Sequence, residues 1–180
     1  MKVVDKKWIL DNYKEDDYIW YVCYGSNLNY DRFMLYINGD ETKELSSYSG
    51  CKIKNPPIES GEYIIDAELY FALESKRWTG GIAFIDYETS GKVYGKKYKI
   101  QLNQFLDILK QERVNKNYDT ILYLNNINDV PVFTFTAEHK LKALNKPNER
   151  YYNVIKQGLL DTYSKLTEAD ADNYLNNCII

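Results

Sequence analysis

The sequence predicts an α+β fold in which a small mixed β-barrel or strongly curved sheet is flanked by helices. Most of the middle of the 180-residue chain consists of short runs of β-branched and aromatic residues separated by turn residues. These runs are joined mostly by short turns, as antiparallel strands are. Segments with helical periodicity interrupt the strands instead of alternating with them, which disfavours a doubly wound parallel sheet.

The length fits one domain, and we expect an N-terminal arm or short helix at 1–17 followed by a single domain at 18–180. The first buried strand is the aromatic run Y-I-W-Y-V-C-Y at 18–24. Further strands are predicted at 49–53, 63–73, 81–86, 93–100, 119–124 and 130–136. Turn residues separate them at 55–57, 60–61, 79–81, 90–91 and 125–126.

Four helices are predicted. A short one covers 28–37, and a clearer one covers 102–114, where Leu102, Phe105, Leu106 and Leu109 fall on one face. A third covers about 148–160, and the last begins at Thr167 with a capping box.

Composition excludes several classes of protein. A net charge of −3 and a pI near 5.3, without clustered Lys or Arg, argue against binding to nucleic acid or to an anionic membrane. The N-terminus lacks the apolar stretch of a signal peptide, and no run approaches the roughly 18 apolar residues of a membrane span. Three cysteines without a close pair fit a reducing compartment. We therefore expect a cytoplasmic protein.

The sequence contains none of the common metal-binding or nucleotide-binding motifs, and His139 is its one histidine. Cys23 and His139 could in principle form a thiol nucleophile and its base. Cys23, however, lies inside a strongly apolar run, where a cysteine usually packs as a small inert side chain.

The segment Y-G-S-N-L at 24–28, here named the YGSNL segment, follows the first buried strand directly. A strand that runs through one glycine into a helix start leaves backbone N–H groups available for an anion or an oxyanion. Gly25 would let a ligand approach the backbone closely. The alternative is an ordinary turn in which Ser26 or Asn27 only caps the following helix.

Glu112 continues the apolar stripe of the 102–114 helix, because it lies seven residues after Phe105 and three after Leu109. It also lies near the helix C-terminus, where the dipole disfavours a carboxylate. Both features predict a raised pKa, which suits a general acid or base. Alternatively, a frayed last turn would let Glu112 reach solvent or pair with Arg113 or Lys116.

The run W-T-G-G-I-A-F at 78–84 contains a glycine pair, Gly80 and Gly81. The pair predicts a hairpin turn or, alternatively, a bulge that admits a ligand or another stretch of backbone.

Taken together, these segments resemble the γ-glutamyl cyclotransferase family. Its Y-G-S-N-[LM] hallmark matches residues 24–28, its W-x-G-G-[IV]-A strand matches 78–83, and its V-[WY]-G-x-x-Y strand matches 93–98. The family helix that ends near L-x-x-Q-E-G-V is similar to 109–114, and its P-S-x-x-Y helix start is similar to 147–151. The blocks occur in the family's order over residues 18 to 160.

The resemblance implies an α+β, cyclotransferase-like domain that converts a γ-glutamyl amine or amino acid into 5-oxoproline and a free amine. Glu112 would be the catalytic acid and base, and no cofactor or metal would be needed. The substrate-binding residues implied are Tyr21, Tyr24, Gly25, Ser26, Asn27, Leu28, Gly80 and Gly81. The expected partner is this small-molecule substrate alone, with no nucleic acid and no membrane, in a monomer or homodimer.

The sequence departs from the family pattern at Arg113, where the family has glycine, and at Phe135, where some members have a substrate-binding tyrosine. The arm before Tyr18 has no family counterpart. Two alternatives follow: a non-catalytic ligand-binding member of the fold, or amide or acyl chemistry on another γ-glutamyl intermediate.

Overall fold

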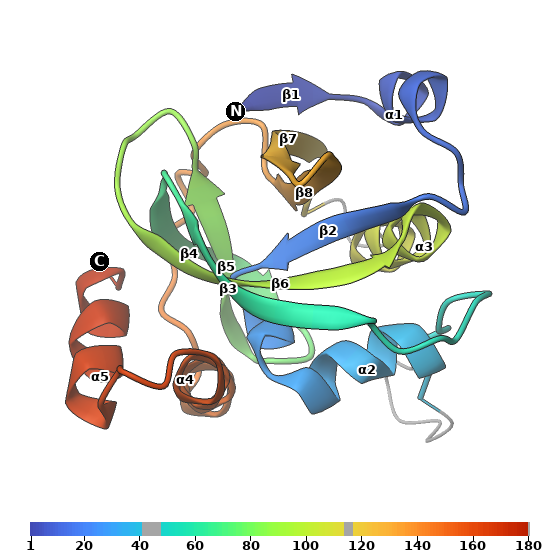
Figure 1. Cartoon of the computed structure of the whole chain (residues 1–180). Helices are drawn as coiled ribbons and strands as arrows, with labels where there is room; N and C mark the ends of the chain where they lie inside the picture. The colour runs from blue at the N-terminus through green and yellow to red at the C-terminus, as the bar shows by residue number, and fades with distance from the viewer. Residues whose placement is uncertain (41–47, 114–116, 180) are drawn as a thin grey trace. The chain divides into compact units, whose positions relative to one another are not determined.

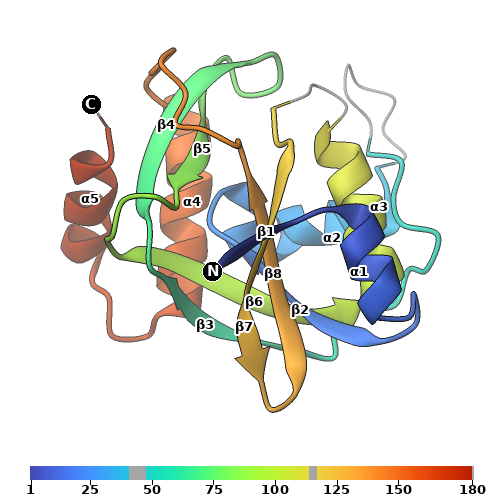
Figure 2. The same ribbon diagram turned by 90° about the horizontal axis from the view of Figure 1, so that it is seen from above.

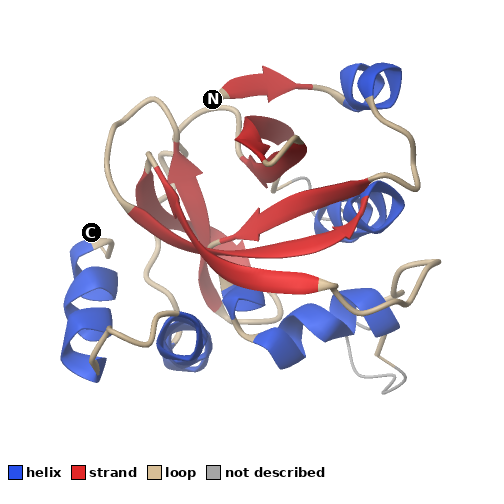
Figure 3. Cartoon of the chain, in the orientation of Figure 1, coloured by secondary structure: helices blue, strands red, loops and turns tan. Residues whose placement is uncertain are grey.

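A computed structural model describes residues 1–40, 48–113 and 117–179, except for the side chain of Arg113. Helices and strands occur together, which confirms the α+β class (Figure 3). The elements in chain order (Figure 1) are β1 (Lys2–Val4), α1 (Lys6–Asn12), β2 (Tyr18–Cys23), the 3-10 helix η1 (Ser26–Leu28), α2 (Tyr30–Asn38), β3 (Glu59–Ile65), β4 (Glu68–Ser75), β5 (Gly80–Asp86), β6 (Val93–Gln101), α3 (Leu102–Arg113), β7 (Thr120–Ile127), β8 (Val130–Thr136), α4 (Glu149–Thr162) and α5 (Glu168–Asn177).

Six strands form one sheet in the order β1-β7-β8-β2-β6-β3, and β4 and β5 form a separate two-stranded sheet. The larger sheet is mixed, because β2 pairs parallel with β8 whereas β7 pairs antiparallel with β1 and β8. Within the described ranges no pairing joins β1 to β3, the two ends of this order. The mixed sheet is confirmed, whereas the closed barrel or strong curvature is not found.

The chain divides into two compact units. Unit 1 contains residues 1–22, 34–61 and 97–138, and unit 2 contains residues 23–33, 62–96 and 139–180. Strands β2, β3 and β6 are each divided between the units, so the chain changes unit several times.

The core of unit 1 is a cluster of aromatic rings. Tyr21 of β2 stacks on Phe135 of β8 with ring centroids 5.5 Å apart, and Phe105 of α3 lies 5.7 Å from Tyr21. Phe133 lies 5.8 Å from Phe105, and all four rings are buried. The 102–114 periodicity predicts this arrangement correctly, because Phe105 belongs to the apolar stripe of α3. The predicted last residue of that helix, Val114, lies outside the described residues.

The β7–β8 hairpin turns later than predicted. Asn128 and Asp129 both have positive φ, at 48° and 64°, which is the geometry of a tight hairpin turn. Asn125 and Asn126, predicted as the turn, belong to β7, where the register shifts between Tyr123 and Asn125. At the other edge of β7 lies β1, and the three strands overlap in the view of Figure 2. The N-terminal arm thus contributes both a strand and the helix α1.

The strand predicted at 49–53 is wrong. Gly50 has φ of 75°, and a Cβ added to it would lie 2.8 Å from the backbone nitrogen of Gly39. The N–H of Cys51 bonds instead to the carbonyl of Ile37, 2.9 Å away at the end of α2. This segment therefore makes its backbone hydrogen bonds to a helix end, which strand periodicity cannot reveal.

The single strand predicted at 63–73 is two strands, β3 and β4. They are separated at Asp66, whose carboxylate accepts hydrogen bonds from the Ser90 hydroxyl at 2.7 Å and the Gly91 N–H at 3.1 Å. The predicted turn at 60–61 lies inside β3. Strands β4 and β5 then pair antiparallel in unit 2.

The two C-terminal helices of unit 2 begin as the sequence predicts. The Asn148 side chain accepts from the N–H of Arg150 and caps α4. Thr167 and Asp170 form the predicted capping box of α5. The two helices lie side by side (Figure 1), linked by Lys156, which bonds Asp172 at 2.8 Å.

Gly158 lets α4 pack directly on the chain around η1. A Cβ at this position would lie 2.5 Å from both the Leu28 carbonyl carbon and the Asn29 nitrogen. Because both neighbours are backbone atoms, they cannot move aside cheaply.

We expect Gly158→Ala to lower the free energy of unfolding by about 1–3 kcal/mol, since the added methyl overpacks a buried backbone contact. Gly61→Ala is the control, because its added Cβ would meet only the end of Lys97 at 3.6 Å. Urea unfolding of both variants measures the difference. Equal stability of the two variants would contradict this packing.

Candidate functional site

The YGSNL segment forms a tight turn in unit 2. After Cys23 ends β2, the N–H of Leu28 bonds to the carbonyl of Gly25 at 3.0 Å, and the N–H of Asn29 bonds to that of Ser26 at 3.1 Å. The donors of these two bonds are the N–H groups of Leu28 and Asn29. The turn itself therefore does not use the N–H groups of Gly25 and Ser26. The helix predicted from Leu28 is in fact η1 followed by α2, which begins at Tyr30.

Burial differs along this segment. Tyr24, Asn27 and Leu28 are buried, whereas Gly25 and Ser26 are partly exposed. Gly25 and Ser26 are therefore the solvent-accessible residues of the segment. Gly25 and Ser26 are the members of the segment best placed to meet a ligand.

Tyr151 of α4 is a residue that the sequence reasoning placed in a family block but not among the site residues. Its hydroxyl accepts from the N–H of Ala83 at 3.2 Å. The same oxygen would lie 2.9 Å from a Cβ built on Gly25. The structure thus brings the YGSNL segment, the 78–84 run and the start of α4 together in unit 2, and Gly25 leaves room for this hydroxyl.

A double-mutant cycle tests that contact. Gly25→Ala should destabilise the wild-type background, because its methyl meets the Tyr151 hydroxyl, and should cost less in a Tyr151→Phe background, where the oxygen is gone. The measurement is the free energy of unfolding of all four proteins. A coupling energy indistinguishable from zero would show that Gly25 does not make room for Tyr151.

Trp78 places two cations beside Tyr151. Its buried ring lies 4.8 Å from the Tyr151 ring, and the guanidinium groups of Arg32 and Arg150 lie 4.9 Å and 5.2 Å from its centroid. Guanidinium groups over an aromatic face are held by cation–π attraction. Two positively charged side chains therefore lie close to Tyr151 in unit 2.

Gly80 and Gly81 contact another stretch of backbone. A Cβ on Gly81 would lie 2.0 Å from the Asn145 carbonyl oxygen, and one on Gly80 would lie 2.6 Å from the Asn148 nitrogen. The N–H of Gly81 also bonds to the carbonyl of Lys146 at 2.8 Å. Of the alternatives for the glycine pair, close approach of another backbone accounts for both residues. Their contact with substrate stays a prediction.

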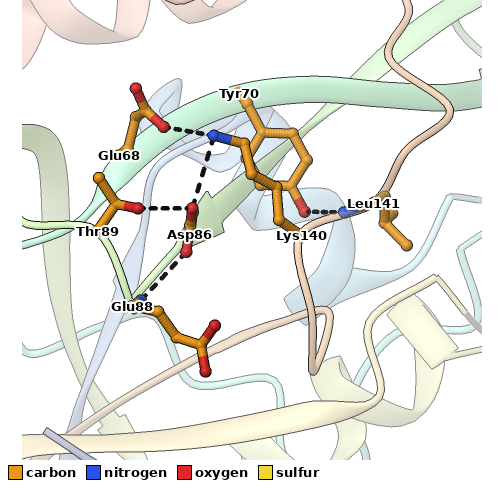
Figure 4. A network of polar contacts seen from close by, with 7 residues as sticks. All are labelled: Glu68, Tyr70, Asp86, Glu88, Thr89, Lys140 and Leu141. Carbon is orange, nitrogen blue, oxygen red and sulfur yellow. Dashed lines mark hydrogen bonds and ion pairs between the residues drawn. The ribbon is translucent and has the colours of Figure 1, made fainter.

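The backbone that approaches is residues 139–148, here named the strap. Its start is held by a polar network (Figure 4): Lys140 forms ion pairs with Glu68 at 2.5 Å and with Asp86 at 3.5 Å. Further along, the N–H of Leu73 bonds to the Ala143 carbonyl, and the N–H of Asn145 bonds to the Phe71 carbonyl. The strap thus runs along β4 and leads to α4, which carries Tyr151.

Asp86 is the buried charge of this network. Burial by itself would raise the pKa of its carboxyl, but hydrogen bonds from the Thr89 hydroxyl and the Glu88 N–H, together with the charge of Lys140, bring that pKa below its ordinary value. A lowered pKa stabilises the fold above the unfolded-state value of 3.8, and this contribution is lost as the pH falls through the lower folded value.

We expect Asp86→Asn to unfold at lower urea concentration than wild type at pH 7, with a difference that shrinks as the pH falls below 3.8 and Asp86 becomes protonated in the wild type. Asp11→Asn is the control: its partner Lys7 is also exposed, and such surface pairs contribute little. A stability difference that does not depend on pH would rule out the ionised Asp86 as its source.

Lys96 is a buried cation in unit 2 that the sequence reasoning passed over. It lies on β6, is 8% exposed, and its Nζ lies 3.5 Å from the Leu28 carbonyl oxygen at the end of the YGSNL segment. The alternation of side chains along a strand does not predict that Lys96 is buried beside the YGSNL segment. Cys23, the alternative nucleophile, is also buried here, and its thiol donates to the Lys96 carbonyl at 3.4 Å.

Glu112 lies in the last turn of α3 in unit 1, partly buried, after the buried residues Phe105, Ile108 and Leu109. It therefore continues the apolar stripe as predicted. Its carboxylate hydrogen-bonds with the hydroxyl of Tyr36 on α2. Burial, and then the negative charge of Glu112, raise the pKa of Tyr36 well above its ordinary value, so the phenol stays protonated.

Tyr21, the other predicted site residue of unit 1, is 2% exposed and stacked on Phe135. Phe135 therefore packs in the aromatic core at the position where some family members have a tyrosine. The proposed substrate contact of Tyr21 stays a prediction.

The described residues show neither a metal-binding cluster nor a membrane-spanning helix. No group of three or more His, Cys, Asp or Glu side chains arranged to hold a metal ion was found in those ranges. In the same part of the chain, no helix has the length and apolar character needed to cross a membrane.

Sequence comparison finds a distant relative. No family model matches the chain. Histone deacetylase 5 of Arabidopsis thaliana is 26% identical over 214 aligned residues, which cover 96% of this chain and 32% of the relative. The chain thus spans about a third of that protein.

Solved structures share the fold. A γ-glutamyl cyclotransferase superposes with a TM-score of 0.63 at 17% identity over 88% of each chain. The uncharacterized human protein loc79017 gives 0.61 at 18% identity over 89% of each chain. YkqA of Bacillus subtilis gives 0.60 at 19% identity, covering 90% of this chain and 55% of YkqA. The fold that the motifs of this sequence implied is therefore confirmed.

Proposed function

On the premise of a fold shared with γ-glutamyl cyclotransferase, we propose that this chain cyclises a γ-glutamyl amine or amino acid. The observation that carries the proposal is the match to that enzyme's fold over 88% of the chain. The YGSNL segment and Glu112, which the motif resemblance selects, support it. The activity in the name of the Arabidopsis relative is that of a protein three times as long and forms no part of the proposal.

The reaction needs no nucleophile from the enzyme. The α-amine nitrogen of the substrate attacks its own γ-carbonyl carbon, a new C–N bond closes the five-membered ring, and the original amide C–N bond breaks. The products are 5-oxoproline and a free amine, and no water is consumed. Because both reacting groups belong to one molecule, the main task of the protein is to hold the substrate in the folded-back conformation.

Glu112 would accept the proton that the attacking amine loses and deliver it to the leaving nitrogen. Glu112 is partly exposed, and the Tyr36 hydroxyl hydrogen-bonds with its carboxylate. An ionised carboxylate is the form that accepts a proton.

The N–H groups of Gly25 and Ser26 would bind substrate oxygens and stabilise the negative charge that develops on the γ-carbonyl oxygen. The turn itself uses neither of these groups, and both residues are partly exposed. Lys96 and Arg32, also in unit 2, supply positive charge suited to the α-carboxylate of a γ-glutamyl group.

Incubation with a panel of γ-glutamyl amines and γ-glutamyl amino acids tests the proposal, with 5-oxoproline, glutamate and free amine all quantified. We expect 5-oxoproline and amine in equal amounts from at least one compound. Glutamate in place of 5-oxoproline would contradict cyclisation and favour amide hydrolysis of a γ-glutamyl compound. Ligand-induced thermal stabilisation without any product would favour a non-catalytic binding protein.

Glu112→Gln should lower kcat about 10²–10⁴-fold with little change in stability, because the amide keeps the size of the side chain but cannot accept the proton. Glu74→Gln, at an exposed position on β4, is the matched control and should keep full activity. Wild-type turnover by Glu112→Gln would exclude this mechanism.

A further inference from the structure

Tyr36, which no motif selects, lies against Glu112 in unit 1, and a second tyrosine, Tyr48, packs on Tyr36. Tyr36 belongs to α2 and Tyr48 follows the segment at 41–47; their ring centroids are 4.4 Å apart, with planes inclined at 57°. Both side chains are buried, with exposed fractions of 7% and 8%. The Tyr36 hydroxyl hydrogen-bonds with the Glu112 carboxylate and with Tyr48.

The direction of the bond to Glu112 follows from the donors available. An ionised carboxylate only accepts, so Tyr36 donates its O–H hydrogen to Glu112. Tyr36 also forms a side-chain hydrogen bond with Tyr48, and this bond raises the pKa of Tyr36. Tyr36 therefore links Tyr48 to Glu112.

The backbone of Tyr36 is held in place from two sides. The Gln111 amide nitrogen, next to Glu112 on α3, donates to the Tyr36 carbonyl at 3.1 Å, and its amide oxygen accepts from the N–H of Gly50 at 3.3 Å. The Cys51 thiol also donates to the Tyr36 carbonyl, at 3.3 Å. Both the side chain and the main chain of Tyr36 are therefore engaged around the last turn of α3.

We propose that Tyr36 is a positioning residue that fixes the orientation of the Glu112 carboxylate for proton transfer, and that Tyr48 fixes Tyr36 in turn. The proposal rests on the function proposed above for Glu112. A glutamate side chain has three rotatable torsions, so the carboxylate of a partly exposed glutamate without such a partner would sample several orientations. A buried phenol on a helix, already anchored through its own backbone, selects one of them.

The remaining titratable groups described nearby do not duplicate this role. The Asp107 carboxylate, one turn earlier on α3, accepts from the N–H of Lys52 at 2.9 Å. Lys110 is exposed. Burial, and then the charge of Asp107, raise the pKa of the Cys51 thiol to about 12, which keeps it neutral. Among these described groups, Tyr36 is the one shown to hydrogen-bond with Glu112.

The kinetic test uses Tyr36→Phe and Tyr48→Phe, which remove one hydroxyl each and keep the ring packing. We expect Tyr36→Phe to lower kcat by between about tenfold and a hundredfold, with KM within about twofold of wild type, because orientation matters most in the transition state. Tyr48→Phe should have a smaller effect of the same kind. The control is Tyr123→Phe, whose hydroxyl bonds Asn126 elsewhere in unit 1 and should leave kcat unchanged.

A second measurement does not require turnover. In protein labelled with ¹³C at glutamate carboxyls, the Glu112 signal is identified by its loss in Glu112→Gln, and its titration is followed in each variant. Removing a hydrogen bond donated to the carboxylate favours the protonated form, so the titration midpoint should move to higher pH in Tyr36→Phe and stay unchanged in Tyr123→Phe.

The two measurements separate failure of this inference from failure of the proposed function. If the wild type forms no 5-oxoproline, the proposed function fails, while a shifted midpoint in Tyr36→Phe still supports the contact between Tyr36 and Glu112. An active wild type whose kcat and Glu112 midpoint are both unchanged in Tyr36→Phe would overturn the positioning role. A loss of kcat with an unchanged midpoint would likewise overturn it, because the hydroxyl would then act elsewhere.

Discussion

The burial of β2 is the constraint on which the rest of the structure depends. Every residue from Ile19 to Cys23 is at most 5% exposed, so the strand is covered on both faces and at both edges, between β8 and β6. A strand in this position tolerates only apolar or aromatic side chains of the right size. Tyr21 enters the aromatic core of unit 1, and the strand delivers the YGSNL segment in unit 2 directly after its last residue.

Unit 2 shows how close backbone packing can prepare a site. Glycine occurs at positions 25, 80, 81 and 158, and at each of them a Cβ would meet another atom at less than 3 Å. These contacts hold the strap on the β4–β5 hairpin and bring α4 onto η1, so the Tyr151 hydroxyl reaches both Gly25 and Ala83. Short side chains let separate stretches of chain approach one another, and the approach itself fixes the positions of the polar groups.

In unit 1, the position of Glu112 depends on a hydrogen bond and not on close backbone packing. Here the carboxylate meets the phenol of Tyr36, whose pKa is raised by burial and then by the negative charge of Glu112, so that the phenol stays protonated. A phenol that stays protonated can donate a hydrogen bond to a carboxylate over the whole physiological pH range. The two features that the motifs select thus depend on different interactions: steric room around Gly25 in unit 2, and a hydrogen bond from Tyr36 to Glu112 in unit 1.

The sequence alone determined the features that depend on local pattern. Apolar spacing located α3 and placed Glu112 on its stripe, the aromatic run located β2, and the capping box at Thr167 located the start of α5. Each of these is set by neighbours within a few residues, so periodicity and capping chemistry suffice to predict it.

Only the tertiary structure decided the features that depend on residues far apart in the chain. The strand predicted at 49–53 does not form, because Cys51 bonds to the end of α2. The partners of the site residues, Tyr36 for Glu112 and Tyr151 for Gly25, come from 76 and 126 positions away. No period in a sequence records which distant backbone approaches a glycine or which phenol meets a carboxylate, since those contacts exist only once the elements have packed.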